Sequence, residues 1–393
     1  MEPPRDRRGT AASRLRPPLL SRLGVLAVGL AVGLTEGTLP IGFAVAQPAP
    51  PVNVEALAVA ADPGPYAVGT WDARHVDAAR HDRVVRLRVY YPAAGHTEAG
   101  VPPVVGASGS PYAVVVGDGI IGDVFGAHLA SHGFVFVAVQ SQGPYFVFLH
   151  EAMIDFPLDL VFGLDLLAAG ELGVPAAAVD SDRTGVVGHS FGSWNALALA
   201  GARVDPQHLQ RTCAERPAAW SDNWWTYVCG TPQRWAGFEA AAREVGLAAP
   251  AGLWEPFGDA RIRAAMALGP EGFDLTGPAG LASVEVPVLL VAAGADEMND
   301  YVPATTELFA HLPDADLITF VGATHLWVFV GDAQPHLRRF ALAFFDVNLR
   351  GGAAWTHILT PAFVEGIAPT LGGRTGFEGL VWGVAGEGTV GGR

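Results

Sequence analysis

The chain of 393 residues contains no lysine, so all 24 of its cationic side chains are arginines. A P-loop lysine, a pyridoxal Schiff base and a Ser-Lys dyad are therefore excluded, because each of them needs an amine. Charged residues make up only 16% of the chain, and the formal net charge is −15. Because an acidic surface repels phosphate backbones, we expect no nucleic-acid partner. Half of the residues are hydrophobic, which suffices for a large core and excludes a wholly disordered chain.

Cysteine is nearly absent, and only Cys213 and Cys229 occur. Two thiols cannot complete a structural zinc site with four ligands. In an oxidising compartment we expect them to form a disulfide, which would contribute about 3 kcal/mol for a loop of this size.

The first 46 residues indicate export from the cytoplasm. Six arginines precede an apolar run over residues 23–34, and Ala44-Val45-Ala46 offers a small-x-small cleavage site. An uncleaved membrane anchor over residues 23–46 is the alternative, but polar residues and a proline after residue 34 favour a signal peptide of residues 1–46. We therefore expect a secreted or periplasmic protein with no stable membrane span after cleavage.

Strand and helix patterns alternate through residues 64–350, after a linker of residues 47–63. The expected strands are 83–91, 103–107, 133–140, 186–189, 261–268, 286–293 and 316–322, and the expected helices include 156–169, 303–312 and 335–349. Continuous apolar strands of this kind are typical of a buried parallel sheet. The alternation predicts an α/β fold with a mostly parallel central sheet flanked by helices.

Two segments depart from this alternation. Residues 203–258 carry both cysteines and five of the ten tryptophans, and we interpret them as a cap inserted after the helix that follows residue 190. We expect most of these rings to form the core of the cap, and an apolar substrate surface is the alternative. Residues 351–393 form a C-terminal extension, and its glycine-rich part, residues 372–393, is expected to be loose.

The run Gly188-His189-Ser190-Phe191-Gly192 is the most informative motif. It is a Gly-x-Ser-x-Gly turn between a short apolar strand and a run of small, helix-forming residues. This turn holds a serine on a strained corner, where side chains at the two glycines would crowd it. Ser190 is therefore the candidate nucleophile, and a simple glycine-rich loop is the alternative.

A serine nucleophile needs a histidine base and an acid that orients it, in the chain order serine, acid, histidine. His325 directly follows the last expected strand of the sheet. The other histidines after Ser190 lie in the cap, on helical stretches or in the tail: His208, His311, His336 and His357. Asp296 ends the strand and loop 286–296, and Asp300 is the alternative acid. The oxyanion hole needs two backbone N–H groups, for which we predict Phe191 and, in the loop after residues 103–107, Ser110.

Two other motifs predict different chemistry. Residues 117–122, GDGIIG, form a Gly-x-Gly-x-x-Gly sequence, which would suit a dinucleotide-dependent oxidoreductase. However, Gln140 stands where such a protein needs an acid for the ribose. His128 and His132 are spaced for one face of a helix but have no evident third ligand, so we expect no metal. His132 is instead predicted to be a cation at a helix C-terminus.

The segments VYYP (89–92), HLASHGF (128–134), VVGHSFG (186–192), VPVLLVAAGAD (286–296) and GATH (322–325) occur in an order that resembles one family. This is the exported, serine-dependent, dienelactone-hydrolase-like branch of the α/β-hydrolases. The branch is similar to platelet-activating-factor acetylhydrolases and to bacterial cutinase-like polyester hydrolases. The resemblance covers roughly residues 64–350. It implies an α/β-hydrolase fold with a cysteine-bearing cap after the nucleophile helix, and catalysis by Ser190, Asp296 and His325 with Phe191 and Ser110 as oxyanion donors.

From the motifs and the resemblance we expect a secreted, monomeric serine hydrolase that cleaves carboxylic esters through an acyl-enzyme and needs no cofactor. Its substrates would be short-chain acyl esters or polyesters. An acyltransferase with the same three catalytic residues is the remaining alternative.

Overall fold

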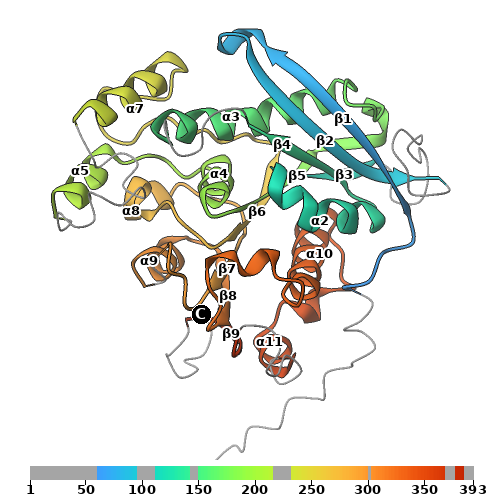
Figure 1. The fold of residues 1–393 in the computed structure, drawn as a ribbon. Helices are drawn as coiled ribbons and strands as arrows, with labels where there is room; N and C mark the ends of the chain where they lie inside the picture. Colours follow the sequence, from blue (N-terminus) through green and yellow to red (C-terminus); the bar gives the residue numbers. More distant parts are fainter. Residues whose placement is uncertain are drawn as a thin grey trace, which may run out of the picture. The chain divides into compact units, whose positions relative to one another are not determined.

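A computed structural model describes residues 60–94, 111–141, 149–215, 232–299, 302–367 and 377–384, all within the compact unit Ala49–Arg393. In these residues, nine strands form one sheet with the order β1-β2-β4-β3-β5-β6-β7-β8-β9 (Figure 1). The strands are β1 (Ala67–Asp77), β2 (Arg83–Ala93), β3 (Tyr112–Asp118), β4 (Val135–Gln140), β5 (Val179–His189), β6 (Ile262–Leu268), β7 (Val288–Ala293), β8 (Ala315–Val321) and β9 (Gly379–Trp382).

The centre of the sheet, from β4 to β8, is parallel, whereas β1, β2 and β9 pair in antiparallel fashion at its two sides. The parallel strands are apolar throughout because both of their faces are covered, and every residue of β7 is buried. The expectation of an α/β fold with a mostly parallel sheet flanked by helices is confirmed.

Helices cover both faces of the sheet (Figure 1). Side chains alternate along β3, so Val114 and Val116 join the apolar layer of α3 and α4, while Ala113 and Val115 join that of α2 and α10. The helices are α2 (Gly119–Ser131), α3 (Leu149–Ala168), α4 (Phe191–Leu199), α5 (Pro206–Glu215), α7 (Pro232–Glu244), α8 (Phe273–Leu281), α9 (Glu307–His311), α10 (Gln334–Arg350) and α11 (Pro361–Ile367). Among the described residues, no helix is both long and apolar enough to cross a membrane.

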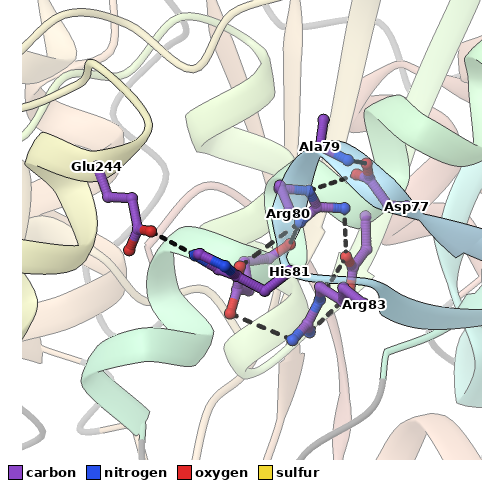
Figure 2. A network of polar contacts seen from close by, with 8 residues as sticks. Asp77, Ala79, Arg80, His81, Arg83 and Glu244 are labelled. Carbon is purple, nitrogen blue, oxygen red and sulfur yellow. Dashed lines mark hydrogen bonds and ion pairs between the residues drawn. The ribbon is translucent and has the colours of Figure 1, made fainter.

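An ionic network fastens the turn between β1 and β2 to α3. Arg80 and Arg83 extend from this turn (Figure 2) and donate to Asp159, whose side chain is fully buried. The Arg83 guanidinium binds both carboxylate oxygens of Asp159 at 2.8 Å, and Nη2 of Arg80 binds Oδ1 at 2.7 Å. At the exposed tip, His81 also pairs with Glu244 of α7. The hairpin is therefore held by charge as well as by strand pairing.

Three strands were not among those expected from the sequence: β3, which lies between β4 and β5, and the two strands at the sides of the sheet. β1 pairs with β2 along its whole length. β9 lies in the glycine-rich tail that was expected to be loose, but residues 379–382 pair with β8 instead. The helix α11 of the same extension buries Phe363, Val364 and Ile367 in the main core. The expected strand 103–107 lies outside the described residues.

The described part of the cap, α5 and α7, packs on the main fold. Trp235 and Trp254 of this segment stack with Phe238, and Phe238 and Trp254 are buried in the apolar layer of α3 and α4. These two tryptophans therefore pack into the main core of the protein, whereas the sequence analysis expected a separate core within the cap. Cys229 lies outside the described residues, as do the tryptophans 220, 224 and 225, so the disulfide with Cys213 remains a prediction.

Candidate active site

The turn after β5 has the geometry of a nucleophile elbow. Ser190 has φ 55° and ψ −121°, a strained conformation for a residue with a side chain, and it directly precedes α4. A Cβ atom at Gly188 would collide with the backbone of Gly192, and one at Gly192 would collide with the carboxylate of Asp118. Ser193 secures the turn, since its Oγ donates to the carbonyl of Ser190 at 2.6 Å. Gly188 is thus required by close approach of the backbone, whereas Gly192 makes room for the Asp118 side chain.

Asp296 and His325 are in direct contact at the carboxyl edge of the sheet. Nδ1 of His325 lies 2.9 Å from both carboxylate oxygens of Asp296, and both side chains are buried. Oδ1 of Asp296 also accepts the N–H groups of Met298 and Asn299 at 2.9 and 2.8 Å. Asp300, the alternative acid, lies outside the described residues. The carboxylate is therefore held by its own loop and by the imidazole at once.

His189, immediately before Ser190, connects the elbow with the loop of His325. Its ring lies 4.8 Å from the His325 ring, centroid to centroid, and its Nε2 donates to the His325 carbonyl at 3.0 Å. Burial lowers the pKa of His189 to about 3, so the ring is neutral and this nitrogen keeps its proton. The residue packs against Trp327 and Phe329 as well. Ser190 is thereby brought to the same edge of the sheet as the other two candidate catalytic residues.

Sequence reasoning did not identify several residues that support this arrangement. Glu297 accepts the backbone N–H of His325 at 2.9 Å. The Asn299 side chain donates to the carbonyl of Gly269, after β6, at 2.8 Å. Asp296, which directly precedes Glu297, was the nearby signal in the sequence. The contacts themselves could not be predicted because they join segments that are far apart in the chain.

Ser110, the expected second oxyanion donor, lies outside the described residues. Beside the elbow, β3 ends and the chain continues into Gly119, the first residue of α2. Of the two predicted donors, Phe191 is the one within the described residues, where it starts α4 directly after Ser190.

The GDGIIG sequence does connect a strand, a helix and a parallel strand, as a dinucleotide-binding unit does. However, the Asp118 side chain caps α2, and its Oδ1 accepts the Ile121 N–H at 3.1 Å. A carboxylate thus occupies the helix N-terminus, where such a protein would bind a pyrophosphate. The glycines serve packing instead, since a Cβ at Gly122 would overlap Ala138 of β4.

The His128 and His132 rings lie 4.8 Å apart on α2, centroid to centroid. Burial lowers the pKa of both side chains, to about 3 for His128. Contrary to the sequence prediction, the pKa shift disfavours a cationic His132, whose Nε2 donates to the Asp62 carbonyl at 3.0 Å. No group of three ligating side chains occurs in the part of the chain that the structure describes.

Exposed apolar side chains accompany the candidate catalytic residues. Ile120 follows the end of β3, and Leu326, Phe329 and Val330 follow His325. The aromatic ring of Phe329 also touches that of His189. These four residues, which we call the apolar rim, place hydrophobic surface on the segments that carry the site.

No protein-family model matches the chain, and no curated protein is significantly similar to it. The chemistry of the site is therefore inferred from the arrangement of Ser190, Asp296 and His325 and from the segments that hold them.

Proposed function

We propose that this protein is a serine hydrolase of carboxylic esters with an α/β-hydrolase fold. The observation that carries the proposal is the bond between His325 Nδ1 and Asp296 beside a serine with φ 55°. The link from His189 to the His325 carbonyl adds support, because it joins the elbow to the histidine loop. A strained serine followed in the chain by an acid and a histidine is the arrangement that acyl transfer requires.

In the proposed reaction, Asp296 accepts a hydrogen bond from Nδ1–H of His325, and this tautomer leaves Nε2 unprotonated and free to act as the base. His325 takes the proton of the Ser190 hydroxyl as its oxygen attacks the ester carbonyl, and then protonates the departing alcohol. Water repeats the cycle on the acyl-enzyme and releases the acid. The backbone N–H groups of Phe191 and Gly119 would stabilise the oxyanion, with Gly119 replacing Ser110 as the second donor.

The apolar rim favours an ester with a hydrophobic acyl or alcohol part. A short-chain acyl ester and a polyester both satisfy this chemistry. We further propose that the protein is exported and that Cys213 and Cys229 form a disulfide in the cap, as the oxidising compartment would allow.

The proposal is tested with p-nitrophenyl esters from acetate to palmitate and with a fluorophosphonate probe. Ser190→Ala should lower kcat by about 10⁶-fold and abolish labelling without a change in Tm. Asp296→Asn should lower kcat by about 10⁴-fold, because the imidazole is then held in the wrong tautomer.

Ser283→Ala is the matched control, since Ser283 precedes β7 and lies toward the opposite edge of the sheet. It should keep the wild-type kcat and label normally. Labelling that persists in Ser190→Ala, or a wild-type protein inactive on the whole ester series, would refute the proposal.

A further inference from the structure

Asp118 is the last residue of β3, and its carboxyl group touches three segments around the elbow. Oδ1 accepts the Ile121 N–H at 3.1 Å and so caps α2. The backbone N–H of His189, at the end of β5, favours the ionised form of this carboxyl and lowers its pKa. The other oxygen, Oδ2, fills the space that a Cβ at Gly192 of α4 would need. One side chain therefore ties together the start of α2, the end of β5 and the start of α4.

Both N–H groups of the proposed oxyanion hole lie within these segments. Phe191 stands between His189 and Gly192, and Gly119 directly follows Asp118. The distance between the two donors therefore depends on how the three segments are spaced. We propose that Asp118 is a positioning residue for ester hydrolysis and holds the two oxyanion donors at their working separation. The inference rests on the proposed function.

A capping role alone does not account for this residue. Burial raises the pKa of the Asp118 carboxyl to about 6, so a negative charge at this position is costly at neutral pH. A serine or an asparagine caps a helix equally well without that cost. While Oδ1 caps α2, Oδ2 lies against Gly192 of α4. A serine side chain is too short to make both contacts, and in asparagine one of the two oxygens is replaced by a nitrogen that donates.

Two variants of Asp118 separate its role as a helix cap from its proposed role in positioning the oxyanion donors. Asp118→Asn keeps one oxygen for the cap but replaces the other, which lies beside Gly192, by an amide nitrogen that cannot accept a hydrogen bond. Asp118→Ser also keeps a cap and is too short to reach the other segments, so it serves if the asparagine variant does not fold. Asp123→Asn is the matched control, because Asp123 is an exposed aspartate on the same helix.

The measurements are kcat and KM for p-nitrophenyl acetate, the affinity for phenylboronic acid, which forms a tetrahedral adduct with a catalytic serine, and Tm. A displacement of catalytic groups by about 1 Å lowers rates by up to about 100-fold. For Asp118→Asn and Asp118→Ser we expect kcat to fall by about 10- to 100-fold, boronate affinity to fall in parallel, and KM to change by less than about threefold. Asp123→Asn should match the wild type.

A kcat equal to that of the wild type, a loss shared by Asp123→Asn, or a lower kcat with unchanged boronate affinity would overturn the inference. These outcomes leave the proposed function intact, because the wild type remains an active esterase. A wild-type protein without esterase activity would overturn the proposed function and this inference with it.

Discussion

Replacing Asp159 by asparagine should destabilise the fold more than any exposed ion pair can. The fully buried carboxylate accepts three charge-assisted bonds, at 2.7, 2.8 and 2.8 Å, from Arg80 and Arg83. Those arginines are themselves only 12% and 16% exposed. Asparagine removes the fully buried charge that the two arginines share. Because Asp77 and Asp155 still pair with these arginines, the cost should lie near the lower end of the range of about 3–5 kcal/mol expected for breaking a buried ion pair. At roughly 1.5 °C per kcal/mol for a unit of this size, Tm should fall by about 5 °C.

The control lies on the same hairpin. Arg88 binds Asp72 through two nitrogens, at 2.7 and 3.1 Å, but these side chains are 48% and 66% exposed. Asp72→Asn should therefore change the free energy of unfolding by less than about 1 kcal/mol. Urea unfolding and thermal scans of both variants provide the comparison. Equal losses in the two variants would refute the view that burial makes the Asp159 network important.

Two further predictions concern the site. His189→Phe keeps the ring packing but removes the donor to the His325 carbonyl, so unfolding free energy should fall by about 1–3 kcal/mol and kcat by about tenfold. A variant with wild-type values in urea unfolding and ester hydrolysis would contradict this role. Because burial raises the Asp118 pKa from 3.8 to about 6, the folded protein binds that proton more tightly than the unfolded chain. Stability should therefore fall by at most about 3 kcal/mol as pH rises from about 4 to 6 and then level off, and Asp118→Asn should remove this component from urea titrations across that range.

The central sheet and the acid–histidine pair were accessible from sequence because their signals are local. The parallel strands are continuous apolar runs, and Asp296 and His325 each follow such a run. β1 was missed because its antiparallel pairing leaves one face in water and its sequence, AVGTWDARHVD, mixes charged and apolar residues. β9 was missed because a short glycine-flanked segment becomes a strand only by bonding to β8.

The strand whose end lies beside the elbow, β3, was not identified for a related reason. Two apolar runs, 103–107 and 112–118, precede the elbow, and nothing in their composition tells which one pairs with β5. The structure pairs the second of them with β5. Asp118 could not be recognised from the sequence, because its partners His189 and Gly192 are about seventy residues away along the chain.

β9 is the edge strand at one side of the sheet. It occupies the backbone donors and acceptors of β8 from Ile318 to Val321. A chain shortened before residue 377 would leave that row of groups open to a strand from another molecule. Because β9 has only four residues, it leaves a short edge, and removing it should favour edge-to-edge association through the longer β8.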